Sequence, residues 1–544
     1  MVNPNLRART CNLGEYLFVL LFGLVALTIT SVPYLLGAAL ATEERIFGGF
    51  VYATEDCYSY LAKMRQGAEG AWLFRIAYTA ETHPRALFFP FHLLLGKVAA
   101  LLPGSEADLT TCMVWVYHGA RWVCGLILLA TTYRFLAAFT QRVEVRRLAW
   151  LMVTFGGGLG WLLVAVGQPG WLGSMPLDFI LPEGFTFLVL YAFPHIALAR
   201  SLLLWGFLFL LRAWDHSDGP DPRLAGLKWA ARAGFLWLAM GLIVPFYVGV
   251  AWAVMGAAWV ALGMRRRRVC WRQGWLAGLA VALSAPIVAY SGWVFTTDGV
   301  YRTWAAQNRI LSPHPLHYLA AYGVPLALAC FAARDAWCGD GPGWLALVWV
   351  AIVPVLVYLP FNLQRRLVVG VQVPLSLLAA WGAVKLWRRG RRWLVGALVA
   401  TMVPTACLLL LGGSAWMLSR PALVFRDGGE IAAMDWLEGR IQPAEVVLTA
   451  YDTGNYLPVR VPARVFLGHG FETVDFEQKE ALVKRFFSVT TGDVWRRQLL
   501  AEHGVDYIVW GPAERALGDF EPHTAPYLRQ VYEAAGYVVF EVKQ

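Results

Sequence analysis

The sequence is poor in charged residues for its length. Only 15% of its 544 residues are Asp, Glu, Lys or Arg, whereas 58% are hydrophobic and the mean hydropathy is +0.52. Soluble domains carry about 25% charged and about 45–50% apolar residues. The composition therefore excludes an ordinary soluble protein and predicts a polytopic membrane protein. Its 26 Trp residues fit a chain that lines two membrane–water interfaces.

The sequence also lacks the motifs of common soluble enzymes and of metalloproteins. Its eight Cys residues are scattered, without a CxxC pair or a metal-ligand spacing, which favours a packing role. The C-terminal region has no GxGxxG, Walker A motif or nucleophile elbow. The net charge of +10 resides mainly in short loops between apolar runs. This pattern indicates membrane orientation, so no nucleic-acid partner is expected.

Eleven apolar runs are long enough to cross a hydrocarbon core of ~30 Å. Arg7 and Arg9 precede the first run, and no clear small-residue cleavage site follows, so we expect a retained first span rather than a signal peptide. The predicted spans lie near residues 14–39, 112–139, 148–167, 186–212, 228–246, 247–264, 273–296, 316–334, 344–361, 367–386 and 392–415.

The basic clusters predict the orientation of these spans. With eleven spans, nearly every Lys and Arg cluster falls on one side of the membrane, as the positive-inside rule requires. The N-terminus is then cytoplasmic, and the loop 40–111 and everything after the last span are extracytoplasmic. Segment 86–103 is apolar but short. Counting it as a span would put Arg142 to Arg147 outside, so we expect an interfacial or re-entrant helix there.

Composition divides the chain into a transmembrane part, residues 1–418, and an extracytoplasmic part, residues 419–544. In the first external loop, 56–68 is predicted to be an amphipathic helix on the bilayer surface. After residue 420 charged residues become frequent and strand-length apolar runs alternate with helix-like stretches, which predicts a small α/β domain. Strands are expected at 446–449, 464–467, 507–510 and 537–540, and helices at 429–440, 475–487, 493–503 and 523–534.

Two adjacent carboxylates, Glu55 and Asp56, follow the first span. A carboxylate at the edge of a low-dielectric cavity can act as a general base toward an acceptor hydroxyl, and Asp56 is the preferred candidate. The alternative is an exposed pair, or a cap for the helix that follows, because free N–H groups and the helix dipole stabilise acidic residues there. The spacing does not separate the two carboxylates.

Arg365 and Arg366 form a basic pair at an external segment end, contrary to the general charge distribution. Interfacial snorkelling would explain such a pair. The alternative is a fork of donors for the phosphate of a lipid-linked substrate, which suits arginine geometry.

Other ionisable residues lie at segment ends on the same predicted side. A His beside a Pro is more often a loop or cap residue than a catalyst, but ionisable groups at membrane depth are functional candidates. A divalent metal is compatible with this set, although no spacing indicates one, and no metal site is predicted. We interpret His469, in the external domain, mainly as part of a turn between a strand and a helix. The alternative is that it lies over the membrane cavity. The substrate-cavity candidates are Glu81, His83, Glu183, His195 and His314.

This layout resembles the GT-C class of integral-membrane glycosyltransferases. Glu55-Asp56-Cys57-Tyr58 matches the placement of that class's acidic motif, and His83-Pro84 with the aromatic and Leu-rich sequence after it is similar to a His-Pro segment of many members. The order of the pair here is Glu-Asp, where many members have Asp-Glu. The resemblance implies a helical membrane bundle with an external domain, and a polyprenyl-phosphate-linked sugar whose phosphate Arg365 and Arg366 would face.

The expected activity is an inverting transfer of this sugar to an acceptor hydroxyl on a glycan, lipid or protein, with membrane lipids around the enzyme. Two alternatives remain open. A transporter or flippase would also have many spans and buried ionisable residues, but usually shows internal repeats, and none is convincing here. A non-catalytic membrane scaffold with an external binding domain would tolerate changes at Asp56 and Arg365.

Overall fold

The computed structural model describes residues 11–102, 108–215 and 222–543, so Arg7 and Arg9 lie outside the described residues. The chain divides into two compact units. Unit 1 contains residues 1–31, 119–292 and 310–412, and unit 2 contains residues 32–118, 293–309 and 413–544. The predicted boundary at residue 418 remains a prediction. In space, the first external loop and the C-terminal segment belong to the same unit.

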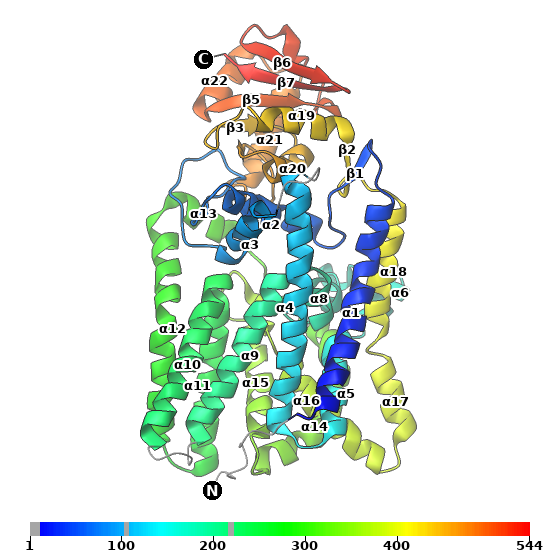
Figure 1. The fold of residues 1–544 in the computed structure, drawn as a ribbon, viewed down its shortest axis with the longest axis vertical. Helices are drawn as coiled ribbons and strands as arrows, with labels where there is room; N and C mark the ends of the chain where they lie inside the picture. The colour runs from blue at the N-terminus through cyan, green and yellow to red at the C-terminus, as the bar shows by residue number, and fades with distance from the viewer. Residues whose placement is uncertain (1–10, 103–107, 216–221, 544) are drawn as a thin grey trace. The chain divides into compact units, whose positions relative to one another are not determined.

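Unit 1 is built of helices, and Figure 1 shows several of them running side by side. Helices lie at all eleven predicted spans, and four of those spans are broken. One break is a turn at 369–371. The other three fall at a run of three glycines from Gly156, at Phe193-Pro194, and before Pro404, where backbone geometry or a missing N–H ends a helix. The helices wholly or partly in this unit are α1 (Leu13–Ala39), α4 (Leu109–Phe139), α5 (Val143–Phe155), α6 (Gly160–Ala165), α7 (Leu177–Ile180), α8 (Thr186–Ala192), α9 (Pro194–Asp215), α10 (Pro222–Ile243), α11 (Phe246–Arg266), α12 (Trp271–Thr297), α14 (Pro315–Cys338), α15 (Gly343–Leu356), η3 (Gln364–Val368), α16 (Gln372–Arg388), α17 (Arg392–Ala400) and α18 (Pro404–Leu418).

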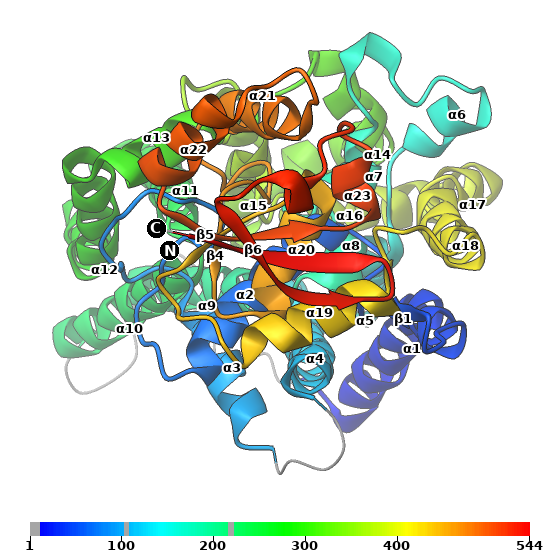
Figure 2. The ribbon, with the colours of Figure 1, turned by 90° about the horizontal axis from the view of Figure 1, so that it is seen from above.

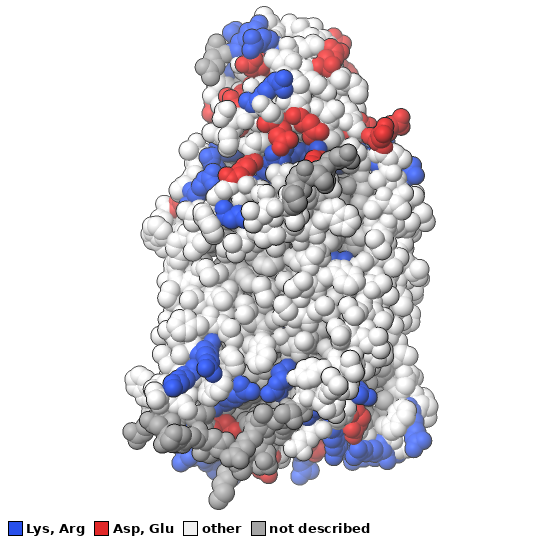
Figure 3. Space-filling view, in the orientation of Figure 1, with Lys and Arg blue, Asp and Glu red and all other residues white. Residues whose placement is uncertain are grey.

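The protein is an integral membrane protein. Among the described residues, eight helical stretches are long and apolar enough to cross a membrane, and α15 is a shorter apolar helix. In Figure 3 the middle of these helices is almost free of charged side chains, and Lys and Arg gather near the end where α11 leads into α12. The number of eleven spans and their orientation remain predictions.

Unit 2 contains a five-stranded mixed sheet in the order β4-β3-β5-β7-β6. Strands β3, β4 and β5 are parallel, and β7 pairs antiparallel with β5 and β6. Figure 2 shows α19 on one face of the sheet and α21 and α22 on the other. The strands are β3 (Val446–Leu448), β4 (Arg464–Val465), β5 (Val505–Trp510), β6 (Leu528–Ala534) and β7 (Tyr537–Val542); the helices are α19 (Gly428–Glu438), α20 (Tyr451–Arg460), α21 (Phe476–Phe487), α22 (Asp493–Glu502) and α23 (Pro512–Arg515).

The first external loop supplies the rest of unit 2. Its helices are α2 (Thr54–Ala68) and α3 (Pro90–Ala100), and α13 (Gly299–Gln307) comes from a later loop. A strand of this loop, β1 (Arg45–Phe47), pairs antiparallel with β2 (Phe425–Asp427) of the C-terminal segment. The loop is therefore tied to the C-terminal segment by backbone hydrogen bonds.

Helices α2 and α3 pack closely because each has a glycine at the contact. A Cβ atom on Gly67 would lie 2.0 Å from the Leu93 carbonyl oxygen, and one on Gly96 would lie 1.7 Å from that of Met64. At 11 residues α3 rises only about 16 Å, roughly half of a hydrocarbon core. Within residues 86–102, the described part of this segment, the helix is therefore too short to span a membrane, as expected.

Two sequence-based expectations about unit 2 were wrong. The helix predicted at 56–68 forms as α2, and its place on a bilayer surface stays a prediction, but its charged side chains do not face water as expected of an amphipathic surface helix. Lys63 and Arg65 are both buried, because acidic residues of the C-terminal segment pair with them. The helix predicted at 523–534 is instead strand β6, which pairs with β7.

Candidate functional site

The carboxylate of Asp56 lies beside a histidine from the C-terminal segment. Asp56 is in the first turn of α2, which begins after Ala53, a residue in left-handed conformation with φ of 49°. His469 Nε2 lies 3.3 Å from Asp56 Oδ1. The His469 side chain is only 6% exposed, whereas that of Asp56 is 43% exposed. One partner of the pair is thus held by the protein and the other is accessible.

Glu55 has a different neighbour. The Glu55 carboxylate accepts a hydrogen bond from the hydroxyl of Tyr451. Burial and, second to it, the charge of Glu55 raise the pKa of this tyrosine. The two adjacent carboxylates therefore have distinct environments, a tyrosine for Glu55 and a histidine for Asp56. The structure separates two residues that the spacing left equivalent.

A buried ion pair fixes the segment that carries His469. Lys63 Nζ lies 2.6 Å from Glu472 Oε1, and Ser59 Oγ donates to the same oxygen at 2.5 Å. Burial alone would raise the pKa of Glu472, but the charge of Lys63, the nearby His469 and the hydrogen bonds from Lys63 and Ser59 together lower that pKa. Lys63 and Ser59 are on α2, so the helix that carries Asp56 also anchors the His469 segment.

Glu81 and His83 have structural partners. Glu81 Oε2 lies 2.6 Å from Nζ of Lys479, whose charge lowers the pKa of Glu81 against the effect of burial. His83 Nε2 accepts from the Ile76 N–H at 3.0 Å, so Nδ1 donates to the Glu81 carbonyl oxygen at 2.8 Å. These contacts favour a role for both residues in holding the first loop.

Within unit 1, Glu183 and Arg366 form a pair. Arg366 Nε lies 3.4 Å from Glu183 Oε1, with Glu183 4% and Arg366 36% exposed. Arg365 and Arg366 are both in η3 and both half-buried. The sequence predicted these three residues separately, and the structure brings Glu183 and Arg366 together.

The other two histidine candidates lie at the starts of helices in unit 1. His195 is buried in the first turn of α9, next to Phe193. His314 is exposed and caps α14, because its Nδ1 accepts from the Leu316 N–H at 3.4 Å. The cap interpretation, which sequence reasoning weighed for each His beside a Pro, fits His314.

Sequence reasoning missed Arg200, which is completely buried in α9. Its guanidinium donates to the carbonyl oxygens of Pro182 at 2.6 Å and Glu183 at 2.9 Å, and to Thr186 Oγ1 at 3.0 Å. Arg200 thereby fixes the backbone of Glu183, the partner of Arg366. Its place inside a predicted span was a signal, since a charge at that depth is rarely without a role.

The described residues contain no candidate metal-binding cluster. Among the described residues, no cluster of three or more His, Cys, Asp or Glu side chains is placed to hold a metal ion.

Comparison with known proteins identifies the fold. No protein-family model matches the chain. No curated protein matches it either. Solved structures do match: the fold is that of the GT-C class of membrane glycosyltransferases, as the resemblance in the sequence predicted.

Two of the matching structures cover nearly all of the chain. ArnT from Cupriavidus metallidurans, bound to undecaprenyl phosphate, aligns with a TM-score of 0.55 and 15% identity over 96% of this chain and 97% of its own. The oligosaccharyltransferase of Archaeoglobus fulgidus in its apo form aligns with a TM-score of 0.53 and 11% identity over 94% of this chain and 72% of its own. At such identities the likeness establishes the fold alone.

Proposed function

We propose that this protein is a membrane glycosyltransferase that moves a sugar from a polyprenyl-phosphate donor to an acceptor hydroxyl, with inversion at the anomeric carbon. The observation that carries the proposal is the accessible Asp56 carboxylate held against buried His469. The fold supports it, because ArnT has this fold and was solved with undecaprenyl phosphate.

Asp56 is the general base of the proposed reaction. Its carboxylate takes the proton of the acceptor hydroxyl as the hydroxyl oxygen attacks the anomeric carbon. The bond between that carbon and the phosphate oxygen breaks, and the electron pair leaves with the polyprenyl phosphate. A single displacement inverts the anomeric carbon. His469 is a positioning residue, since its contact is with the carboxylate.

Arg365 and Arg366 are the proposed phosphate ligands. Guanidinium groups stabilise the charge that builds up on a departing phosphate, and their fork of donors matches phosphate oxygens. The buried Glu183 carboxylate, 3.4 Å from Arg366 Nε, is an ion-pair partner that helps to orient this guanidinium. Arg200 supports this arrangement through the backbone of Glu183.

The proposed side of the reaction is extracytoplasmic. The positive-inside rule puts the N-terminus in the cytoplasm and both the first loop and the C-terminal segment outside. That the loop and the C-terminal segment share unit 2 supports the proposal that they lie on the same side of the membrane. Glycans, lipids and proteins on that side are the acceptor classes to test.

The test is sugar transfer by the purified protein, with a panel of polyprenyl-phosphate sugars and a membrane-lipid extract. Wild type is compared with Asp56→Asn, Arg366→Ala and the control Arg302→Ala, which alters an exposed arginine of α13. We expect transfer by wild type and control, and a loss with Asp56→Asn and Arg366→Ala. Equal transfer by all four would remove both residues from the mechanism. Ion-driven or ATP-driven transport without transfer would favour the transporter alternative.

A further inference from the structure

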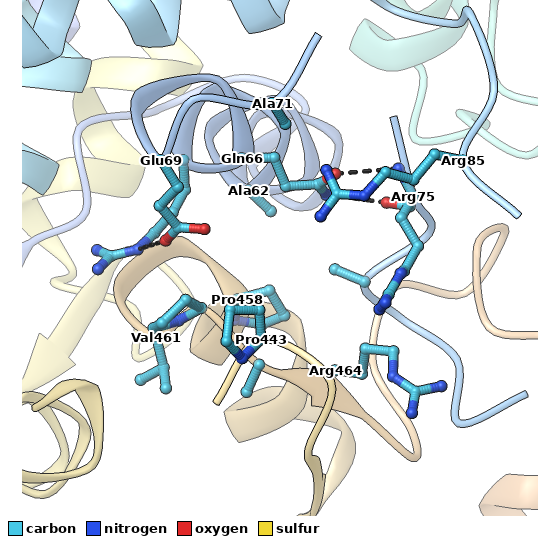
Figure 4. Close-up of a pocket in the computed structure, with 14 residues that line it drawn as sticks. Ala62, Gln66, Glu69, Ala71, Arg75, Arg85, Pro443, Pro458, Val461 and Arg464 are labelled. Atoms are coloured by element: carbon cyan, nitrogen blue, oxygen red, sulfur yellow. Dashed lines mark hydrogen bonds and ion pairs between the residues drawn. The ribbon is translucent and has the colours of Figure 1, made fainter. Parts of the chain in front are cut away.

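A cleft in unit 2 carries arginines that the proposed reaction does not use. Arg75 and Arg85 come from the first loop and Arg464 from strand β4, and all three line a cavity of 130 Å³. The opposite wall includes Pro443 and Pro458. Figure 4 shows the three arginines along one side of this arginine cleft. We infer that the cleft binds the phosphate group of a ligand distinct from the sugar donor.

Among the described residues, no carboxylate forms an ion pair with Arg75, Arg85 or Arg464; Asp506 and Glu81 act on Arg464, and Glu69 on Arg85, only at longer range. Burial, and then the charge of Arg85, lower the pKa of Arg75. Burial, and then the charge of Arg75, lower that of Arg464. The arginines therefore repel one another across the cleft, and an anion between them would relieve this repulsion.

Two of the three arginines, Arg75 and Arg464, are held by uncharged partners. Gln66 on α2 clamps Arg75, because its amide donates to the Arg75 carbonyl oxygen at 2.8 Å and accepts from the Arg75 N–H at 3.0 Å. The guanidinium of Arg464 donates to the carbonyl oxygens of Ala80 at 2.5 Å and Ala444 at 2.6 Å. The backbone of Arg75 and the guanidinium of Arg464 are thus fixed by uncharged partners, which organises these two arginines in advance for an anion.

The size and charge of the cleft favour a phosphate. The cavity is about ten times the ~10–15 Å³ that one water molecule needs, so it holds one anionic group with a few further atoms. A phosphate has enough oxygen atoms to accept hydrogen bonds from several guanidinium groups, whereas a carboxylate has only two oxygen atoms. Glu69 lines the other side of the cleft (Figure 4), and its negative charge is offset by an ion pair with Arg65 at 3.0 Å.

This site is separate from the proposed general base. Gln66 is ten positions after Asp56 on the straight run of α2, a rise of about 15 Å. The inference does not depend on the transferase activity, because it rests on the arginine cleft alone. The phosphate can belong to a soluble phosphate ester or to a lipid headgroup, and the test separates these sources.

The test is calorimetric titration of the full-length protein in neutral detergent with inorganic phosphate, with chloride keeping ionic strength constant. We expect saturable binding that weakens at least tenfold in Arg75→Ala and in Arg85→Ala. Neither side chain pairs with a carboxylate in the described structure, so both variants should fold. The control Arg497→Ala, an exposed arginine of α22, should bind like wild type. Absent binding, or equal affinity in cleft and control variants, would overturn the inference.

A second arm identifies the source of the phosphate. The titration is repeated in nanodiscs of phosphatidylcholine and of phosphatidylglycerol. Unchanged phosphate binding in both supports a soluble ester. Phosphate binding that is lost only in phosphatidylglycerol nanodiscs supports an anionic lipid headgroup that already occupies the cleft. In that case the wild type should also retain more phosphatidylglycerol than Arg75→Ala. Loss of binding with equal lipid retention by the two proteins would overturn the inference.

Discussion

At the scale of single residues, the environment of Asp56 separates it from its neighbour Glu55. Asp56 is accessible and faces His469, whereas Glu55 faces Tyr451. A base needs access to its substrate and a partner that fixes its orientation. Asp56 has both.

His469→Gln should lower kcat by up to about 10²-fold while KM changes little, because a misplaced base slows the chemical step more than binding. Steady-state kinetics measures both parameters, and titration of the active enzyme corrects kcat for misfolded molecules. A fall in activity that is explained entirely by fewer active molecules would indicate a merely structural role for His469.

His83 predicts a pH-dependent stability. Burial lowers its pKa below the ordinary 6.5, so the folded protein favours the neutral ring. The contribution of His83 to the stability of the folded protein is complete above pH 6.5. It is lost as the pH falls from 6.5 toward the lower pKa that His83 has in the folded protein. Melting temperatures between about pH 8 and pH 5 should fall more for wild type than for His83→Gln. The exposed His523 supplies the control, and a His523→Gln protein that loses the same slope would contradict the assignment.

At the scale of elements, two helices in contact depend on two glycines. Gly96→Ala would place a Cβ atom against the Met64 carbonyl oxygen, a backbone atom that cannot move aside alone. Helices α2 and α3 must then separate, at a cost of about 1–3 kcal/mol or more. Chemical denaturation measures this. Gly439→Ala is the control, because a Cβ there meets no atom within 4 Å. Equal stability of the two variants would refute the close packing.

Elements with strong apolar runs were predictable from the sequence, and those set by tertiary pairing were not. All eleven predicted spans contain helices, because long apolar runs in a membrane satisfy their backbone only within helices. Strand β6 reads as a helix because its Glu, Gln and Ala are good helix formers. Pairing with β7 overrides this, through a two-residue turn in which Ala535 and Gly536 have φ of 49° and 80°.

At the scale of the whole molecule, the site joins residues that are far apart in the sequence. His469 and Asp56 are 413 positions apart, as are Ser59 and Glu472. The sequence placed Asp56 in a loop and His469 in a separate domain, and no spacing connects them. Their contact depends on charges that pair only after folding. For this reason the sequence favours a simple turn at His469 over a role near the membrane cavity.

The Lys63–Glu472 pair should be strongly stabilising as a pair. Lys63→Met leaves the buried Glu472 charge uncompensated, which should cost roughly 3–5 kcal/mol. The double variant Lys63→Met/Glu472→Met should lose much less than the sum of the single variants. Lys484→Met, in an exposed pair with Glu480, should cost about 1 kcal/mol or less. Denaturation of all four proteins gives the values, and additive losses at Lys63 and Glu472 would contradict the pairing.

The most direct test of the account is the rate of sugar transfer by Asp56→Asn relative to Glu81→Gln. Both changes neutralise an acidic residue of the first loop, but only Asp56 is the proposed base, while Glu81 pairs with Lys479. We predict that Asp56→Asn lowers kcat by about 10²–10⁴-fold, and that correctly folded Glu81→Gln keeps a rate near that of wild type. Transfer by Asp56→Asn at the wild-type rate would contradict the account.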